Sequence, residues 1–379
     1  MKKIVIFTCI GGHNSVSQSL KAYLSNFYDV LVLNFFLDII GSLDPIRWLT
    51  GSIWTAEDYY SFCVRNRLHN FLNKTYKTSL AAFGVLHKVI RNRIKKRLLE
   101  EKVEILISVI PWFNDYFLSI AQELNITFIL MPTDMEVAHF FNNVPTISYR
   151  RFLFLMPFED ATMHAIALKK GVLPAQICIS GVPLKEDFFI IHNQQDIRVR
   201  LAIAPKKPVI LLLMGSQGSS AMIDYAKKLA SITDVPFHLI MVLGANEKQR
   251  STVERVVFSS SVSTTVLGFT DLIPQLMAIS TLLITKSGGI SISEAIYMNL
   301  PTLMDATSEV LFWEKANQQF MHENRFGTSV HCLQELPSIV RAFLTNRQDM
   351  LEVYKKNMQL FEKKHGALTV KKVLDELDA

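Results

Sequence analysis

Residues 208–220 read PVILLLMGSQGSS, an unbroken apolar run that ends in a glycine turn. The same order occurs near the N-terminus, where the apolar run 3–8 leads into Gly11, Gly12 and His13. Strands without polar alternation are buried on both faces, as in parallel sheets covered by helices. Because strand, glycine turn and helix follow one another twice, the sequence predicts two α/β domains of the Rossmann-like type.

Further apolar runs extend this alternation along the chain. They predict strands over residues 30–34, 104–109, 127–131, 176–180, 236–243 and 282–285. The polar, proline-containing segment between the two glycine turns predicts a linker. We therefore expect an N-terminal domain over 1–182, a linker over 183–207, a C-terminal domain over 208–345 and closing helices over 346–379.

Composition limits the classes of protein to which the chain can belong. Its 379 residues carry a net charge of +6, and 49% of them are hydrophobic. The best candidate for a spanning segment, residues 30–40, is broken by Asn34 and Asp38 and is shorter than the roughly 20 residues required. The apolar N-terminus is too short for a cleaved signal, so we expect a buried first strand. Mild basicity suits an anionic membrane surface or a phosphate ligand, and no nucleic-acid motif is present.

The cysteines indicate a reduced compartment. The chain has four, which are far apart and form no C-x-x-C pair. This pattern predicts neither a disulfide framework nor a metal site.

The strongest candidate for a phosphate site lies at residues 285–294, which read TKSGGISISE. Gly288 and Gly289 let a diphosphate approach the start of a helix, where backbone N–H groups and the helix dipole favour anions. Lys286 supplies a cation, and Glu294 lies about a turn and a half into the helix, where it can accept ribose hydroxyls. The alternative is a surface lysine and a solvated glutamate; the combination at this spacing favours the phosphate site.

Two other loops are weaker candidates by themselves. His13 follows a glycine pair at the carboxyl end of the first strand, where open α/β sheets bind ligands. It is either a general base or a loop histidine without chemistry. Residues 215–220 resemble a short phosphate loop but equally fit a plain strand-to-helix turn.

A basic stretch at residues 85–98 predicts an amphipathic helix. Its apolar positions are Val85, Leu86, Val89, Ile90, Ile94 and Leu98. Its cations are Lys88, Arg91, Arg93, Lys95, Lys96 and Arg97. Such a helix either packs on the sheet as an ordinary surface helix, faces an anionic leaflet, or does both. Upstream aromatic residues suit a membrane interface, an acceptor groove or a core: Trp48, Trp54, Tyr59, Tyr60 and Phe62.

Residues 268–278 and 283–295 resemble the donor-site signature of monogalactosyldiacylglycerol synthases and processive diacylglycerol glucosyltransferases. The chain resembles more distantly the enzyme that adds N-acetylglucosamine to make lipid II. The resemblance covers nearly the whole chain. The supporting segments are 11–13, Thr133 and Asp134 with His139, 157–159, 181–183 and 323–327.

The resemblance implies two facing Rossmann-like domains of the GT-B architecture, with closing helices that cross back to the N-terminal domain. It implies inverting transfer of a hexose from a UDP-sugar to a membrane lipid, without metal or cofactor. The acceptor that the resemblance implies is 1,2-diacylglycerol. His13 would be the catalytic base. The donor-binding residues would be Gly12, Gly215, Ser216, Gln217, Gly218, Phe269, Lys286, Ser287, Gly288, Gly289, Glu294, Glu314 and Asn317.

Departures from the family pattern leave alternatives open. Trp313 stands where the family has a glutamine that contacts the hexose, so the identity of the sugar is open. The alternatives are another lipid or a polyprenyl-linked acceptor, a UDP-sugar 2-epimerase, and a non-catalytic UDP-sugar-binding relative. The expected location is cytoplasmic, peripherally associated with the inner face of the membrane.

Overall fold

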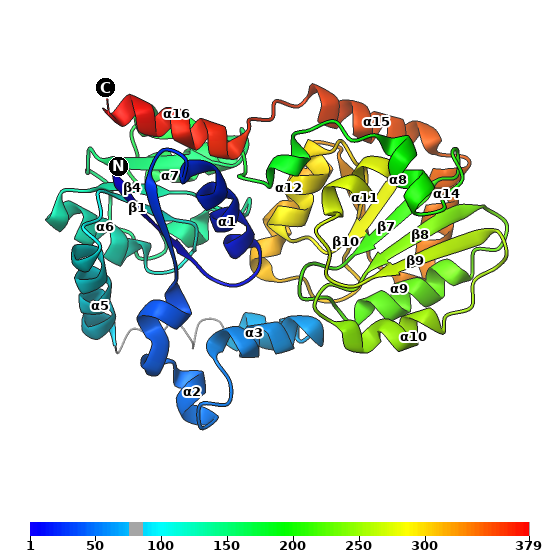
Figure 1. Cartoon of the computed structure of the whole chain (residues 1–379), viewed down its shortest axis with the longest axis horizontal. Coiled ribbons are helices and arrows are strands. Elements are labelled where there is room, and N and C mark those ends of the chain that lie inside the picture. The colour runs from blue at the N-terminus through cyan, green and yellow to red at the C-terminus, as the bar shows by residue number, and fades with distance from the viewer. Residues whose placement is uncertain (76–85, 379) are drawn as a thin grey trace. The chain divides into compact units, whose positions relative to one another are not determined.

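The computed structural model describes residues 1–75 and 86–378, in which strands and helices alternate. This part of the chain divides into two compact units. The first is formed by the ranges 1–60, 74–186 and 363–379, and the second by 61–73 and 187–362. Each unit contains one parallel sheet covered by helices (Figure 1), so the predicted pair of Rossmann-like α/β domains is confirmed.

The sheet of the first unit has the strand order β2-β1-β3-β4-β5-β6. Its strands are β1 (Lys3–Thr8), β2 (Asp29–Asn34), β3 (Ile105–Ser108), β4 (Thr127–Leu130), β5 (Phe152–Met156) and β6 (Ile177–Ile179). Its α-helices include α1 (Gly12–Leu24), α2 (Pro45–Leu49), α5 (His87–Glu100), α6 (Asn114–Leu124), α7 (Ala161–Lys169) and α16 (Gly366–Asp378). Short helical turns are η1 (Phe35–Ile40), η2 (Gly41–Leu43), η3 (Ala138–Phe141), η4 (Pro174–Gln176) and η5 (Glu186–Phe188). The order of the strands reverses between β1 and β3. The loop that follows β1 and leads to His13 therefore lies at the topological switch point.

The sheet of the second unit has the order β12-β11-β10-β7-β8-β9. Its strands are β7 (Val209–Leu213), β8 (Phe237–Val242), β9 (Val262–Leu267), β10 (Leu282–Thr285), β11 (Thr302–Asp305) and β12 (Gly327–Val330). Its helices are α8 (Gln194–Arg200), α9 (Ala221–Ala230), α10 (Arg250–Glu254), α11 (Ile273–Ile279), α12 (Gly289–Tyr297), α13 (Lys315–Glu323), α14 (Leu336–Leu344) and α15 (Gln348–Leu360). Its short turns are η6 (Glu247–Gln249), η7 (Phe312–Glu314) and η8 (Leu333–Glu335). Here the switch point lies between β7 and β10, the strands that lead into the two glycine turns.

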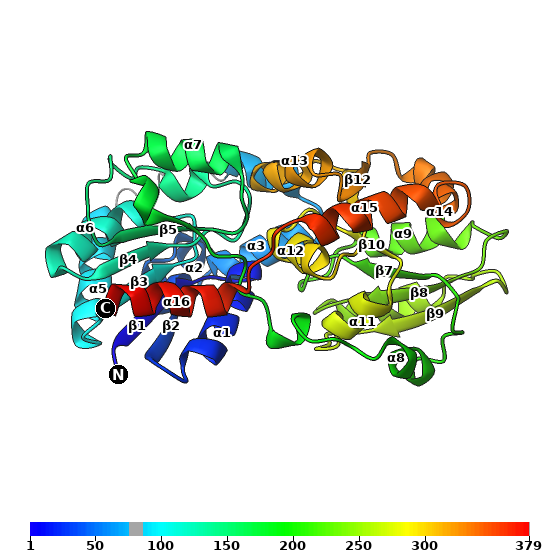
Figure 2. The ribbon, with the colours of Figure 1, turned by 90° about the horizontal axis from the view of Figure 1, so that it is seen from above.

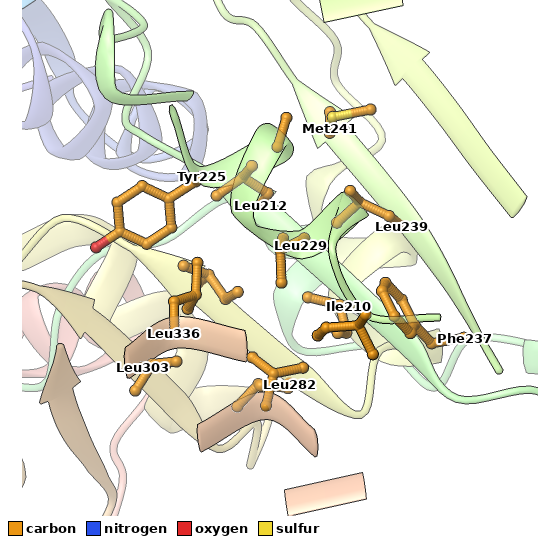
Figure 3. Close-up of a cluster of buried hydrophobic side chains, with 14 of the residues drawn as sticks. Ile210, Leu212, Tyr225, Leu229, Phe237, Leu239, Met241, Leu282, Leu303 and Leu336 are labelled. Atoms are coloured by element: carbon orange, nitrogen blue, oxygen red, sulfur yellow. The ribbon is translucent and has the colours of Figure 1, made fainter. Parts of the chain in front are cut away.

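An apolar core holds the strands of the second unit in place. All residues of β7 and β8 are buried, as the apolar sequence of β7 and the sequence of β8, apolar except for His238, predict. Figure 3 shows Leu212 and Leu239 of the sheet packed with Leu229 of α9 and Leu336 of α14. On the other side α11 packs against β7 and α8. This two-sided burial fixes the carboxyl ends of β7 and β10, where the candidate phosphate loops begin.

The unit boundaries differ from the sequence-based domain limits in three places. The predicted linker 183–207 contains α8, and Arg198 Nη2 donates to Ile279 O of α11 at 3.1 Å within the second unit. Of the closing helices, α15 stays with the second unit because it packs on α14, whereas α16 returns to the first unit and packs on α1 (Figure 2). Residues 61–73 belong to the second unit although they precede most of the first.

Polar side chains divide the apolar run at residues 30–40. The chain leaves β2 at Asn34, whose Oδ1 accepts from Leu37 N at 3.0 Å. Asp38 Oδ2 accepts in turn from Asn34 N at 2.7 Å. The two residues that interrupt the hydropathy pattern therefore cap η1. In the ranges described, no helix combines the length and the apolar character needed to cross a bilayer.

Candidate functional site

The turn from β10 into α12 provides the N-terminus of a helix at the carboxyl edge of the sheet. Gly288 is the N-cap residue of α12, and no side chain caps this terminus. The first turn of α12 contains no acidic residue. The N–H groups and the dipole at the N-terminus of a helix favour an anion. The place predicted for a diphosphate, at Ser287, Gly288 and Gly289, thus has the required local structure.

Side chains from α13 hold this turn from behind. Asn317 Nδ2 donates to Ser287 O at 2.8 Å, and Gln318 Nε2 donates to Ser287 Oγ at 2.6 Å. Asn317 is fully buried and Ser287 nearly so. In the structure, Asn317 therefore fixes the backbone of the turn at Ser287.

Lys286 is paired within the protein. Its Nζ lies 2.9 Å from Glu314 Oε1, and the Glu314 side chain is only 6% exposed. A buried carboxylate beside the ammonium compensates much of its charge. The sequence predicts Lys286 as the cation beside the diphosphate. In the structure, the ion pair between Lys286 and Glu314 also anchors the turn to η7.

The second glycine turn touches the first. Gly215 has a φ of +78°, and a Cβ there would lie 2.9 Å from Lys286 Cε. Gly218 has a φ of +69°, and a Cβ there would lie 2.4 Å from Leu243 O. Only glycine fits both the backbone conformation and the space at these positions. The predicted residues Gly215, Ser216, Gln217 and Gly218 thus form a tight loop beside Lys286, at the switch point.

The remaining predicted donor contacts lie on neighbouring elements, with one exception. Glu294 is partly exposed on α12, and Phe269, 70% exposed, lies in the loop after β9. The carboxyl ends of parallel strands share one edge, so this loop opens at the same edge as the glycine turns. Gly12 begins α1 of the first unit, apart in the chain from the other predicted donor residues.

His13 of the first unit is oriented by two hydrogen bonds at one ring nitrogen. Its Nδ1 lies 2.7 Å from Val109 O, at the end of β3, and 2.9 Å from Thr133 Oγ1. A carbonyl oxygen only accepts, so we assign the proton to Nδ1 and the lone pair to Nε2. Within residues 1–75 and 86–378, Nε2 has no hydrogen-bond partner. This is the tautomer that a general base requires.

The environment also keeps His13 neutral. Burial lowers its pKa from the ordinary 6.5, and the Asp134 carboxylate and the Val109 carbonyl oppose part of that shift. A neutral imidazole at physiological pH is ready to accept a proton. Sequence reasoning had placed Thr133 and Asp134 in a family motif; the structure shows their position beside the histidine.

One further residue reaches the glycine turns without a sequence signal. Arg65 Nη2 donates to Gln217 Oε1 at 2.8 Å. It is separated from Gln217 by 152 positions in the chain, and no motif links the two. The contact belongs to the second unit, which includes residues 61–73.

The basic helix α5 contacts its own unit more than expected for a helix that faces a membrane. Its buried stripe is Ile90, Ile94 and Leu98, whereas Val89 is 45% exposed and Val85 lies outside the described residues. Most of its cations have intramolecular partners. Arg91 and Lys95 pair with Glu123 of α6, Arg93 donates to Ile39 O and Ile40 O, Arg97 pairs with Glu101, and Lys96 lies 3.8 Å from Glu100. Lys88 is exposed. The helix therefore packs and pairs mainly within the unit, because α6 and η1 present acceptors to its basic sides.

The aromatic stretch upstream carries an exposed apolar surface instead. Trp48 is 59% exposed, Leu49 83% and Ile53 79%. Leu37 on the adjoining η1 is 48% exposed. We call these four residues the apolar surface. Arg93 ties α5 to this region through Ser42 Oγ at 3.3 Å.

Comparison with known proteins relates both units to one group of enzymes. Residues 209–376 match the glycosyltransferase family 28 C-terminal domain. The chain is 25% identical to a processive diacylglycerol beta-glucosyltransferase of Staphylococcus epidermidis, over 100% of this chain and 93% of the relative. It is 22% identical to the chloroplastic monogalactosyldiacylglycerol synthase of Spinacia oleracea, over 97% of this chain and 70% of the relative.

Solved structures share the fold. The chain superposes on Acinetobacter baumannii MurG with a TM-score of 0.64 and 13% identity, over 99% of this chain and 100% of that one. UDP-GlcNAc 2-epimerase from Neisseria meningitidis, bound to UDP-GlcNAc, gives 0.59 and 13% identity over 100% of both chains. At this identity the likeness shows the architecture alone, the pair of Rossmann-like domains of GT-B proteins.

Proposed function

We propose that this protein transfers a hexose from a UDP-sugar to 1,2-diacylglycerol. The chain is related over its whole length to the processive diacylglycerol glucosyltransferases and monogalactosyldiacylglycerol synthases. The observation that carries the proposal is the extent of this relationship. It spans the unit that holds His13 and the unit that holds the glycine turns. A binding protein that had lost turnover would have no need of a neutral, oriented histidine.

In the proposed reaction each unit supplies one function. His13 Nε2 takes the proton of the acceptor hydroxyl as the oxygen forms a bond to the anomeric carbon. The bond between that carbon and the diphosphate oxygen breaks, and UDP leaves with the bonding electrons. The N-terminus of α12 and the turn at Ser287–Gly289 stabilise the charge that develops on the diphosphate. Glu294 holds the ribose, Phe269 lies by the base, and neither a metal ion nor a cofactor takes part.

A transfer assay tests this function. The purified protein is incubated with labelled UDP-glucose or UDP-galactose and phosphatidylglycerol vesicles with or without diacylglycerol. We expect a labelled glycolipid only when diacylglycerol is present. Binding of UDP without transfer from any UDP-hexose would favour a non-catalytic relative, and interconversion of UDP-N-acetyl sugars would favour an epimerase.

The lipid acceptor requires that the protein reach a bilayer. We propose peripheral association with the cytoplasmic face of the membrane through the apolar surface Leu37, Trp48, Leu49 and Ile53. Tryptophan and aliphatic side chains partition into the headgroup region, and each large side chain removed from water contributes roughly 1.5–3 kcal/mol. Lys88 and the net charge of +6 add attraction to anionic lipids.

Serine substitution of Trp48, Leu49 and Ile53 is expected to reduce sedimentation with anionic vesicles by about tenfold or more, because apolar area is lost from the contact. The matched control replaces Ile191, Val257 and Leu360 of the second unit, which are 102%, 87% and 76% exposed. That variant should sediment like the unchanged protein. Equal loss in both variants, or in neither, would contradict the proposed surface.

A further inference from the structure

Residues 61–73, which we call the strap, are part of the second unit and form hydrogen bonds to loops at the carboxyl edge of its sheet. The strap contains the end of α3 (Ala56–Arg65) and the residues that follow it. Its partners lie in the loops after β7 and β11, the strands on either side of β10. In the loop after β11, Arg67 Nη2 donates to Thr307 Oγ1 at 2.8 Å, His69 Nδ1 lies 2.7 Å from Glu309 O, and Asn73 Nδ2 donates to Val310 O at 3.1 Å.

Arg65 is the strap residue at the glycine turn after β7. Its guanidinium donates from Nη2 to Gln217 Oε1 at 2.8 Å, and its backbone oxygen accepts from Ser220 N at 3.0 Å. Contacts from both its side chain and its backbone fix Arg65 against the loop. Gly215 of the same loop lies beside Lys286, so the loop that Arg65 contacts borders the turn at the start of α12.

The charge of Arg65 is uncompensated, unlike that of its neighbours. Lys286 pairs with Glu314 at 2.9 Å, and Arg67 lies 3.6 Å from Asp224. In the part of the chain that the structure describes, no carboxylate pairs with Arg65; its partner Gln217 is neutral. Its Nε is buried and has no hydrogen-bond partner. A buried donor without a partner costs about 1–3 kcal/mol, which an anionic ligand recovers.

We propose that Arg65 binds the diphosphate of the nucleoside diphosphate and stabilises its charge as UDP leaves. The inference rests on the proposed function and adds to it a cation that the sequence did not reveal. A guanidinium offers several donors in a fixed plane, which suits two phosphate oxygens at once. The negative charge on the departing diphosphate grows during transfer, so a cation at this edge favours the transition state over the bound substrate.

Two ligands that differ only in the diphosphate distinguish phosphate binding by Arg65 from a structural role. UDP and uridine share the base and ribose, but only UDP carries the diphosphate. Calorimetry on Arg65→Gln should show UDP affinity reduced by about 10- to 100-fold and uridine affinity changed by less than about twofold. Arg65→Lys should recover part of the UDP affinity, because it restores the charge without the planar donors.

The matched control is Arg200→Gln, which removes the same charge from an exposed position on α8 of the same unit. It should leave the affinity for both ligands unchanged. Equal loss of UDP and uridine affinity in Arg65→Gln would show that Arg65 only supports the loop, and unchanged UDP affinity would show no role at all. Wild-type protein that binds no UDP would instead overturn the proposed function.

Discussion

Replacement of His13 by alanine is expected to lower kcat for hexose transfer about 100- to 10,000-fold, while UDP affinity stays within about twofold. The reason is the position of the two ring nitrogens. Nδ1 is held by Val109 O at 2.7 Å, which leaves Nε2 to take the acceptor proton. The glycine turns at residues 215–218 and 287–289 belong to the other unit, so we expect UDP binding to persist. Initial rates with labelled UDP-hexose and UDP calorimetry measure the two quantities.

His164→Ala serves as the control, since it removes a partly exposed histidine, 3.4 Å from Glu159, from α7 of the same unit. It should transfer hexose at the rate of the unchanged protein. Undiminished turnover in His13→Ala would remove His13 from the mechanism, and lost UDP binding would indicate damage to the fold.

The pH profile gives a second readout for the same residue. The active form of His13 is neutral, and burial lowers its pKa below 6.5. Rates should therefore be constant through neutral pH and fall only as the pH drops through that lowered pKa. His13→Ala should lack this acid limb in its residual rate. An inflection above pH 6.5 that depends on His13 would contradict the assigned environment.

In the second sheet the sequence predicts the central strands β7 and β10 well and the edge strands β9 and β12 poorly. Strands such as β7 and β10 are buried on both faces, so their composition alone identifies them. The edge strands β9 and β12 read VSTTVL and GTSV, in which polar residues outnumber or match the aliphatic ones. Backbone pairing with a neighbour makes them strands, and local sequence carries little of that information.

The turn at residues 287–289 can be proposed as a phosphate site from the sequence because the chemistry involved is local. Glycines, a cation and a carboxylate follow one another within residues 285–294, at the start of a helix. Arg65 and the partners of the basic helix were not predictable in this way. Glu123, which pairs with Arg91 and Lys95, is some thirty positions away on α6. Which cation is paired and which stays available depends on tertiary contacts that no spacing rule contains.

Alanine at Gly218 is expected to reduce UDP affinity about 100-fold or more and to lower the stability of the second unit. Gly218 has a φ of +69°, which costs an L-residue roughly 1–2 kcal/mol. Its added Cβ would lie 2.4 Å from Leu243 O and 2.7 Å from Asn246 Cβ, so the loop must move, at a further cost of about 1–3 kcal/mol. Movement of this loop displaces Gly215 and Gln217, and with them the contacts to Lys286 and Arg65.

A second glycine variant, Gly51→Ala, separates the cost of the backbone conformation from the cost of the steric clash. Gly51 has a φ of +62°, and a Cβ there would meet nothing within 4 Å. Gly51→Ala should pay the backbone cost alone and keep full UDP affinity, since it lies in the first unit. Thermal melting and UDP calorimetry on both variants measure the outcome. Wild-type UDP affinity in Gly218→Ala would mean that the loop after β7 does not shape the donor site. The segment 243–246 also holds the loop through Ser216 O, which accepts from Ala245 N at 2.9 Å. The loop therefore has little room to yield, and we expect the binding loss to follow.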